Sequence, residues 1–278
     1  MILIADSGST NTTWCLAEKG SPVNQITTSG INPYFQTEEE IREVIARELD
    51  PYIKDHSIKA IYYYGAGCAF GEQQLILKEI LSSFVPTCIE VSTDLLGAAR
   101  SLCGREAGIV CILGTGSNSC FYDGRSIIKN VSPLGYILGD EGGGAVLGKL
   151  LVGDCLKNQL PKHLSEKFLD QYQLTPSLLL ENVYKKPFPN RFLAKFSCFL
   201  EENIQEEAIY SLVHQSFCSF FTRNVMQYDN YQTYPIHFIG SVAYHFRHVL
   251  LDAAAFFNLS ICSIEQSPVN GLLAYHTT

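Results

Sequence analysis

The chain has 278 residues, of which 46% are hydrophobic and 17% are charged, with 20 Lys and Arg against 28 Asp and Glu. This content is sufficient for well-buried cores, and the length predicts one large domain or two small ones. The formal net charge of −8 argues against nucleic acid or an anionic membrane as the main partner, because both need basic protein surface. The sequence therefore favours a small-molecule partner.

Strands and helices alternate in the first part of the chain. Apolar runs bounded by turn residues predict strands at 2–5, 12–17, 23–28, 58–64 and 87–91. Apolar residues at helical spacing predict helices at 38–49, 71–84 and 95–102. The first helix begins behind a Thr37-x-x-Glu40 capping box, and the second directs Leu75, Leu77 and Ile80 to one face. This order predicts a mixed sheet that opens with an antiparallel meander and is covered by helices.

The second part repeats this pattern with an added segment. Strands are expected at 109–113, 118–122, 126–131, 236–239 and 260–263, and helices at 145–156, 206–228, 242–256 and 269–275. The segment 157–203 is polar, is punctuated by proline and has no counterpart in the first part. It is therefore interpreted as a helical insertion.

Ten cysteines are present, and none of them forms a CxxC pair. Buried thiols are favoured over a metal centre, the alternative, because metal sites need ligands at short fixed spacings. Seven cysteines lie singly in apolar runs, namely Cys15, Cys88, Cys111, Cys120, Cys198, Cys218 and Cys262. The stretch before Asp6 is too short for a secretory signal, and no apolar run reaches membrane-spanning length. A reducing cytoplasm fits these features.

Two predicted hairpins have glycine-containing turns, and their matching positions differ by one constant number of residues. Residues 3–20 and 109–124 each have an apolar run, a small polar turn and an apolar return, and an offset of 108 aligns Gly8 with Gly116 and Trp14 with Tyr122. The repetition predicts two copies of one supersecondary unit, in two domains that face each other. Such turns let backbone N–H groups approach a polyphosphate, whereas the simpler interpretation is two ordinary hairpin turns.

Acidic residues follow three of the predicted strands. Asp6 is placed to hold Mg²⁺ beside phosphate. The second copy has Gly114 at the matching position, as expected if the metal needs only one carboxylate from the two turns. The alternative is a turn residue, since aspartate is common in turns. Asp94 lies at a strand end and a helix N-terminus, where α/β sheets present groups to ligands, with helix capping as the alternative. Asp140 and Glu141 lie in a glycine-dense loop ahead of a helix, at a terminus that favours anions, with helix capping again as the alternative.

The turn Gly240-Ser241 follows a predicted strand and precedes a helix. Its small residues would let a flat ring lie against the backbone, and tight helix–strand packing is the alternative explanation. The nearby residues His237, His245 and His248 are interpreted as core or surface histidines, because their spacing is too weak for a metal site.

Six segments together resemble the sugar kinase, Hsp70 and actin superfamily. Within it, the chain is similar to the N-acetylglucosamine kinase-like branch of the activator-type ATPase family, which includes benzoyl-CoA reductase activators. The matching segments are DSGSTNT (6–12), STDLLGAAR (92–100), ILGTGSNS (112–119), LGDEGGG (138–144), FIGSVA (238–243) and PVNGLLAY (268–275). The resemblance implies an α/β fold of two ribonuclease-H-like domains, each a mixed sheet flanked by helices, with an ATP cleft between them.

The resemblance also implies domain boundaries. It assigns 1–106, with the C-terminal helix at about 265–278, to a sugar- and phosphate-binding lobe. It assigns 107–264, with the insertion, to an ATP-binding lobe.

Roles for individual residues follow from the same resemblance. Asp94 would be the base that takes the proton of the sugar hydroxyl, and Asp6 the acid near Mg²⁺. ATP and its phosphates would be bound by Ser7, Gly8, Ser9, Thr10, Asn11, Gly114, Thr115, Gly116, Ser117, Gly240 and Ser241. The sugar would be bound by Asn32, Gly67, Asp94, Asn118 and Asp140. The family's first phosphate motif is usually richer in glycine, so Ser7 and Ser9 here could narrow the phosphate pocket.

Two functions from different classes remain open. The first is an ATP-dependent kinase acting on an amino sugar, with the 6-hydroxyl of N-acetylglucosamine as the expected acceptor, and with a homodimer as a possible assembly. The second is an ATPase switch that activates a partner reductase, for which Cys68 would be the only glycine-flanked candidate for an iron–sulfur ligand. A sugar-sensing repressor is a third possibility, without a DNA-binding helix pair to support it.

Overall fold

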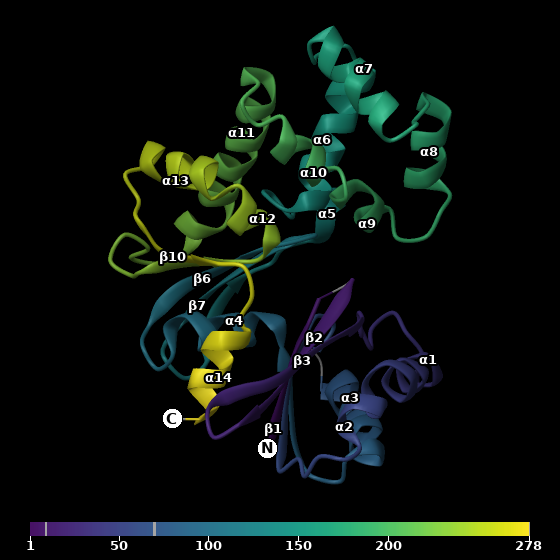
Figure 1. The fold of residues 1–278 in the computed structure, drawn as a ribbon. Helices are drawn as coiled ribbons and strands as arrows, with labels where there is room; N and C mark the ends of the chain where they lie inside the picture. The colour runs from purple at the N-terminus through teal and green to yellow at the C-terminus, as the bar shows by residue number, and fades with distance from the viewer. Residues whose placement is uncertain (9, 69–70, 278) are drawn as a thin grey trace. The chain divides into compact units, whose positions relative to one another are not determined.

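The computed structural model describes residues 1–8, 10–68 and 71–277, which form two compact units (Figure 1). Unit 1 comprises Met1–Gly108, Tyr122–Ile127 and Ser267–Thr278, and unit 2 comprises Ile109–Phe121 and Ile128–Gln266. The short segment Tyr122–Ile127 groups with unit 1, whereas the sequence places it in the second lobe. Two contacts account for this grouping: the Tyr122 hydroxyl donates to the Gly104 carbonyl, and Gly124 packs against the Arg105 carbonyl.

Unit 1 is built on a five-stranded mixed sheet of order β3-β2-β1-β4-β5. β1 pairs antiparallel with β2 and parallel with β4, and β4 pairs parallel with β5. The bounds are β1 Ile2–Ser7, β2 Asn11–Glu18, β3 Ser21–Ser29, β4 Ala60–Gly65 and β5 Cys88–Thr93. This is the predicted meander followed by parallel strands.

Helices cover this sheet and supply its core. They are α1 Glu38–Val44, α2 Asp50–Ile53, α3 Gly71–Phe84, α4 Asp94–Cys103 and α14 Val269–Thr277, with a π-helical turn η1 Ile45–Leu49 between α1 and α2. The predicted capping box is present, since the Thr37 hydroxyl accepts from the Glu40 N–H and the Glu40 carboxylate accepts from the Thr37 N–H. Leu75, expected on the apolar face of α3, is 62% exposed, and the buried face consists of Leu77, Ile80 and Leu81.

The C-terminal helix α14 packs on unit 1 through both apolar and polar contacts. Val269, Leu272 and Leu273 bury against Ile4, Cys15, Ala17 and Tyr64. The Tyr64 hydroxyl bonds to Nε2 of His276 at 2.7 Å and accepts from the Arg100 guanidinium, which also contacts Glu90. Burial lowers the pKa of His276 to about 4, so its ring is neutral at physiological pH.

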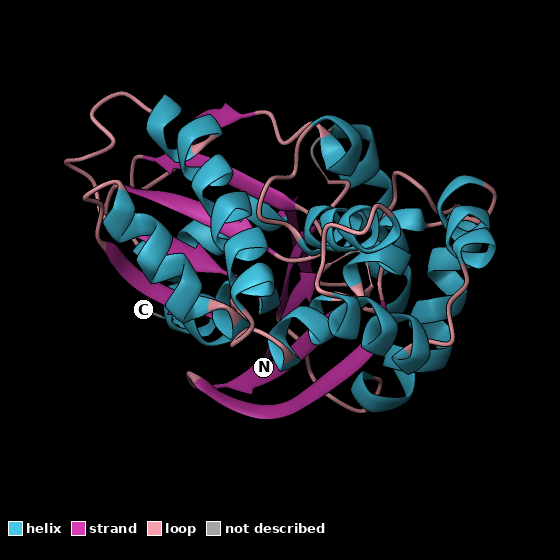
Figure 2. Cartoon of the chain, turned by 90° about the horizontal axis from the view of Figure 1, so that it is seen from above, coloured by secondary structure: helices cyan, strands magenta, loops and turns pink. Residues whose placement is uncertain are grey.

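Unit 2 contains a second five-stranded sheet, of order β10-β9-β6-β7-β8. β9 pairs parallel with both β6 and β10. The strands are β6 Gly108–Leu113, β7 Ser117–Tyr122, β8 Ile127–Val131, β9 Ile236–Ile239 and β10 Ile261–Glu265. The two sheets confirm the predicted fold class, and Figure 2 shows helices alongside the strands.

Helices dominate the rest of unit 2. Those outside the insertion are α5 Gly135–Leu138, α6 Gly144–Leu156, α11 Glu207–Arg223, η2 Val225–Gln227, α12 Ser241–His245 and α13 Arg247–Phe256. The insertion is helical as predicted, with α7 Lys162–Gln171, α8 Pro176–Tyr184, α9 Pro189–Ala194 and α10 Ser197–Glu202. It also joins the core of unit 2, because its buried residues Phe168, Phe196 and Phe199 belong to one hydrophobic cluster with Ile109 of β6 and Phe238 of β9.

Two long predicted helices are interrupted in unit 2. The expected helix 206–228 ends at Arg223, and the expected helix 242–256 is split at Phe246. Phe246 has φ −98° and ψ 22°, outside the helical range, and its ring is buried beside Phe217 of α11. The break thus coincides with an inward aromatic anchor that sequence periodicity does not reveal.

The expectation of buried cysteines is wrong for Cys88, Cys198 and Cys262, which are exposed. Cys88 and Cys262 lie on β5 and β10, the outer strands of their sheets, where one side of the strand has no neighbour. In the segments that the structure describes, no helix is both long and apolar enough to cross a membrane.

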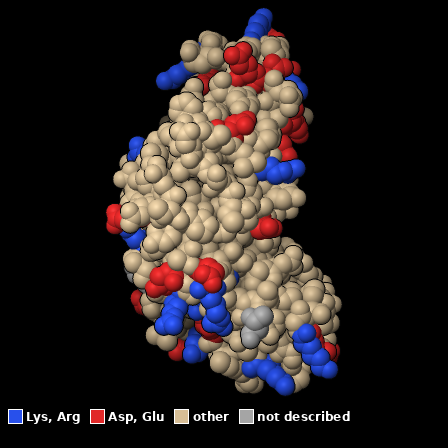
Figure 3. Space-filling view, turned by 90° about the vertical axis from the view of Figure 1, so that its left-hand side faces the viewer, with Lys and Arg blue, Asp and Glu red and all other residues tan. Residues whose placement is uncertain are grey.

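Charged side chains of both signs are interspersed on the face drawn in Figure 3. Lys and Arg lie among Asp and Glu there instead of forming a one-signed field.

Substitution of Gly271 tests how tightly α14 packs. A Cβ at this position would lie 2.3 Å from both the carbonyl oxygen and the hydroxyl of Ser101 on α4. Gly271→Ala should therefore lower the free energy of unfolding by about 1–3 kcal/mol, the usual cost of overpacking. The matched control is the substitution Gly153→Ala in α6, where an added Cβ would meet no atom within 4 Å. The control should stabilise by about 0.5–1 kcal/mol, because alanine favours helix. Urea unfolding followed by circular dichroism measures both, and equal effects would contradict the packing.

Candidate active site

The first candidate phosphate turn joins β1 to β2. β1 ends at Ser7 and β2 begins at Asn11, and the Gly8 N–H donates to the Asn11 carbonyl at 3.0 Å. Gly8, Thr10 and Asn11 are exposed, as a ligand-binding turn requires. Ser9, also predicted to bind phosphate, lies outside the described residues.

Ser7 differs from the other residues predicted for this turn. Its side chain is fully buried, and its hydroxyl is within hydrogen-bond distance of Thr12 Oγ1 at 2.6 Å and of the Ile31 carbonyl at 2.9 Å. The Ser7 hydroxyl therefore points into unit 1 instead of toward a phosphate, which corrects the phosphate role expected for this side chain.

Asp6 and Asp94 are brought together by the sheet register. The parallel strands β1, β4 and β5 end in line, since Gly65 of β4 pairs with Ser7 of β1 and with Thr93 of β5. Asp6 is the penultimate residue of β1, and Asp94 is the first residue of α4, directly after β5. The carboxyl ends of parallel strands are where α/β sheets present ligand-binding groups.

Both carboxyl groups have raised pKa values. Burial raises the pKa of Asp6 to about 7, and the negative charge of Asp94 adds to the effect. Burial also raises the pKa of Asp94, against the opposing effect of the Leu95 N–H, which donates to Asp94 Oδ1 at 2.8 Å. Two neighbouring carboxylates withdrawn from water favour a cation or a proton between them.

Asp94 is not the cap of α4. The Thr93 hydroxyl caps the helix by accepting from the Leu96 N–H at 3.1 Å. The capping role, which was the alternative for Asp94, therefore belongs to Thr93. The Asp94 carboxylate accepts from the Leu95 N–H through Oδ1 and takes no part in the capping bond to Leu96.

Asn32 and Gly67 meet within unit 1. Asn32 is 8% exposed, and Gly67 has φ +80°, where an added Cβ would lie only 2.0 Å from Asn32 Oδ1. Only glycine permits this approach. Cys68 follows and is fully buried. Burial raises the pKa of its thiol to about 12, and the nearby negative charge of Asp94 adds to the effect.

The second candidate phosphate turn joins β6 to β7 in unit 2. β6 ends at Leu113 and β7 begins at Ser117, so the turn is 114–116 and its strand ends match those of the first hairpin at an offset of 106. The offset of 108 expected from the sequence is therefore two residues too long. The structural counterpart of Asp6 is Ile112, not Gly114.

The N-terminus of α6 supports this turn. The N–H of Gly144 donates to the Gly114 carbonyl and that of Ala145 to the Thr115 carbonyl, both at 2.8 Å. The N–H of Gly143, the N-cap, donates to the Asp140 carbonyl at 2.9 Å. The N–H groups of Gly143, Gly144 and Ala145 are therefore bonded to carbonyl groups of the protein.

The two acids before α6 have different roles. Asp140 packs against the turn, since a Cβ on Gly116 would lie 2.6 Å from Asp140 Oδ2. Burial raises the pKa of Asp140 to about 6, opposed by the N–H of Ser117, which bonds to the carboxylate. Glu141 forms an ion pair with Arg223 at 2.6 Å and so ties the loop to α11.

The predicted adenosine turn lies beside the phosphate turn of unit 2. Gly240 has φ +116°, and a Cβ there would lie 2.4 Å from the Leu113 carbonyl oxygen. Ser241 is exposed at the start of α12. Tight packing at Gly240 and a ligand-binding role are thus compatible, because the close approach of Gly240 also brings Ser241 next to the turn 114–116.

Asn118 is engaged in the sheet. Its Oδ1 accepts from the Ser119 N–H and from Asn130 Nδ2, both at 2.9 Å, which links β7 to the end of β8. Of the histidines, His237 bonds to Ser263 and His245 to Glu201. Within the described ranges, no group of three His, Cys, Asp or Glu residues is arranged to hold a metal ion.

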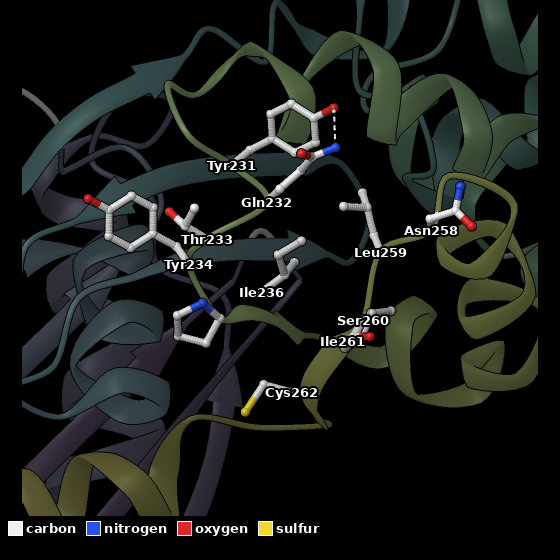
Figure 4. A pocket seen from close by; sticks show the side chains of 11 residues that line it. Tyr231, Gln232, Thr233, Tyr234, Ile236, Asn258, Leu259, Ser260, Ile261 and Cys262 are labelled. Carbon is white, nitrogen blue, oxygen red and sulfur yellow. Dashed lines mark hydrogen bonds between the residues drawn. The ribbon is translucent and has the colours of Figure 1, made fainter.

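A surface pocket of about 520 Å³ in unit 2 lies apart from these residues (Figure 4). It is lined by the residues that precede β9 and β10, including Tyr231, Tyr234 and Asn258. This is the amino end of the two strands, whereas Gly240 follows the carboxyl end of β9. The pocket is therefore no part of the candidate site.

Comparison with solved structures gives the family. The putative N-acetylglucosamine kinase of Porphyromonas gingivalis is 53% identical over 100% of this chain and 99% of that chain, with a TM-score of 0.97. The chain belongs to the N-acetylglucosamine kinase-like family, as the sequence motifs indicate. Neither a protein-family profile nor a curated protein sequence matches the chain.

More distant structures share the fold. The putative N-acetylglucosamine kinase of Chromobacterium violaceum is 17% identical, with 99% of both chains covered and a TM-score of 0.74. A ROK family glucokinase from Streptomyces griseus, solved with glucose and AMPPNP, is 12% identical over 99% of this chain and 97% of that chain, with a TM-score of 0.57.

The raised pKa of Asp6 predicts a pH-dependent stability. The unfolded chain loses the Asp6 proton near pH 4 and the folded chain near pH 7, so the free energy of unfolding falls as pH rises between these values. Asp6→Asn removes this fall. The variant should be more stable than the wild type by roughly 2–4 kcal/mol at pH 8, with the difference shrinking toward pH 4.

Urea unfolding of the ligand-free protein at pH 4.5 and 8 measures this effect. Asp123→Asn is the control of opposite sign, because the N–H groups of Ser126 and Arg125 lower the pKa of Asp123. The Asp123 carboxylate stabilises the fold at pH 8 and loses that effect as pH falls. A pH-independent difference between Asp6→Asn and the wild type would contradict the burial of this carboxylate.

Proposed function

We propose that the protein is an ATP-dependent sugar kinase that phosphorylates an amino sugar, with the 6-hydroxyl of N-acetylglucosamine as the first acceptor to test. The observation that carries the proposal is the 53% identity, over the whole chain, to the Porphyromonas gingivalis protein. The neighbouring carboxyl groups of Asp6 and Asp94 support it, because phosphoryl transfer to a hydroxyl needs a proton acceptor and charge neutralisation.

Asp94 is the proposed base. Its carboxylate takes the proton of the sugar hydroxyl while the hydroxyl oxygen bonds to the γ-phosphorus of ATP. The bond from that phosphorus to the β–γ bridging oxygen then breaks, and ADP leaves with the electron pair. Most of the acceleration in such reactions comes from positioning and charge stabilisation, with the base contributing an additional factor.

Asp6 is the proposed Mg²⁺ ligand. Mg²⁺ prefers one or two carboxylates together with phosphate oxygens and water, and the Asp6 carboxyl beside Asp94 fits that donor set. When bound, the ion supplies charge neutralisation for the phosphates. Cation binding would also favour the ionised form of Asp6, whose pKa is about 7 without it.

The remaining predicted residues have proposed roles in each unit. In unit 2, the turn 114–116 with Ser117 binds phosphate, and Gly240 with Ser241 binds adenosine. In unit 1, Gly8, Thr10 and Asn11 bind phosphate, and Asn32 with Gly67 binds the sugar. Asp140 and Asn118 are proposed to bind the sugar as well. Asp140 has the stronger case, since its carboxylate lies against the turn at Gly116.

The alternative of an ATPase that activates a reductase has little support. Its cluster ligand would be Cys68, which is fully buried with a thiol pKa raised to about 12. A cluster ligand must be a thiolate, and burial of this kind opposes that form. The alternative also gives Asp94 no task.

A coupled ADP-release assay over N-acetylglucosamine, N-acetylmannosamine, glucosamine and glucose tests the proposed function. The expected result is ADP release that depends on both a sugar and Mg²⁺, with the highest kcat/KM for an N-acetylated sugar. ATP hydrolysis at one rate with or without every sugar would refute the kinase assignment.

Asp94→Asn tests the proposed base. Asparagine keeps the shape but cannot accept the proton, so kcat should fall by about 10²–10⁴ while ATP affinity stays within a few-fold. The control is Thr93→Ala, which removes the cap of α4 and should cost about 1 kcal/mol of stability with a much smaller effect on kcat. Near wild-type phosphorylation by folded Asp94→Asn would remove Asp94 from the mechanism.

A further inference from the structure

We infer that Ser7, Thr12 and Tyr63 form a buried hydroxyl network that positions Asn32 for sugar binding. The inference rests on the proposed function for the identity of the ligand. It also explains why serine stands at position 7, next to a turn whose described residues Gly8, Thr10 and Asn11 are exposed.

The three hydroxyls converge on one backbone residue. The Ile31 carbonyl accepts from Ser7 Oγ at 2.9 Å and from the Tyr63 hydroxyl at 3.1 Å. The Ile31 N–H is shared between Thr12 Oγ1 at 3.2 Å and Ser7 Oγ at 3.3 Å. Since the Ser7 proton is directed at Ile31, Thr12 is the donor in the 2.6 Å contact between the two side chains.

These hydrogen bonds take the place of the strand-to-strand bonds that the Ile31 backbone would make inside a β-sheet. β3 ends at Ser29, so Ile31 has left the sheet, yet it is fully buried together with Ser7, Thr12 and Tyr63. A buried backbone N–H and C=O without partners would be costly, so the chain must satisfy both at this bend. The hydroxyls do so with fixed directions, which an apolar contact could not provide.

Asn32 follows Ile31 directly and is fixed from its other side as well. Its Oδ1 accepts from the Tyr34 N–H at 3.0 Å, and its own N–H donates to Gln36 Oε1. Gly67 lies against the same amide group. The position of Asn32 is therefore fixed by the residues that follow it and by Ile31, which precedes it. The hydroxyl network is what holds Ile31.

Two backbone hydrogen bonds beside the network join the first phosphate turn to the sugar side of unit 1. The Thr10 carbonyl of the turn accepts from the Gly30 N–H at 2.9 Å, and the Ser7 carbonyl accepts from the Ala66 N–H at 3.0 Å, one residue before Gly67. Ser7 is thus a positioning residue with its carbonyl bonded toward Gly67 and its hydroxyl toward Asn32.

Paired variants separate positioning from stability. Ser7→Ala and Thr12→Val remove one hydroxyl each, and Thr12→Ser keeps it. Thr28→Val is the matched control, because the Thr28 hydroxyl is also buried in this sheet but bonds to Trp14 Nε1 and the Ser29 carbonyl instead of Ile31. All variants are checked by urea unfolding.

Kinetics provide the first measurement, with the wild-type protein and its preferred sugar as reference. Ser7→Ala and Thr12→Val should raise the KM for the sugar about tenfold, with kcat and the KM for ATP changed less than about threefold, because ground-state sugar binding is what positioning serves. Thr12→Ser and Thr28→Val should keep the wild-type KM for the sugar. A parallel rise of both KM values, or an unchanged sugar KM in folded Ser7→Ala, would overturn the inference.

Hydrogen exchange provides the second measurement and does not depend on the reaction. Peptides that span 30–36 should exchange faster in Ser7→Ala and Thr12→Val than in Thr28→Val, because the bend loses its bonded partners. Unchanged exchange there would refute the network's positioning role even if the protein phosphorylates sugars. If the wild type phosphorylates none of the sugars, the proposed function fails, and exchange still decides the positioning. Should Ser7→Ala not fold, the Thr12→Val and Thr12→Ser pair carries the test.

Discussion

The parallel pairing of β1, β4 and β5 is the constraint on which unit 1 depends. Because the three strands end in register, a carboxylate on β1 and another at the start of α4 are forced together, away from most of the solvent. An isolated pair of this kind is unfavourable, and the raised pKa values of Asp6 and Asp94 express that cost. The sheet therefore holds a region of unfavourable charge that a cation and a substrate hydroxyl can relieve.

In unit 2 the comparable role is taken by close backbone packing. Gly143 lies against Gly116, Gly144 donates to Gly114, and Gly240 lies against the Leu113 carbonyl. A side chain at Gly143 or Gly240 would meet backbone atoms within 3 Å, so the turn, the start of α6 and the start of α12 can meet only through glycine. The glycine-rich motifs thus have a packing function that exists before any ligand binds.

The sequence predicted the elements well where local chemistry determines them. The capping box at Thr37, the hairpin turns and the bounds of α3 and β9 follow from residue type and spacing, and so does the class of fold. Residue type and spacing did not predict which residue within a motif has which role. Ser7 sits among exposed phosphate-turn residues but turns inward, and Asp94 leaves capping to Thr93. Both outcomes depend on tertiary partners, Ile31 and the β1–β4–β5 register, that no local pattern contains.

The same limit applies to residues whose role no local sequence pattern indicates. Tyr63 is the middle of three consecutive tyrosines. Tyr64 is equally buried, so Tyr63 is distinguished by the hydrogen bond of its hydroxyl to the Ile31 carbonyl. The break of α12 and α13 at Phe246 likewise depends on Phe217, which lies 29 positions earlier on another helix. Sequence periodicity reports which face of an element is apolar, but not which single side chain anchors it.

The placement of α14 has a consequence for biosynthesis. The helix completes unit 1, yet the ribosome makes it only after all of unit 2 has been translated. Until then Ile4, Cys15 and Ala17 lack the apolar partners that bury them in the finished protein. The nascent chain must therefore carry an uncovered sheet face through the synthesis of more than half its length, which makes this surface a natural point for chaperone protection.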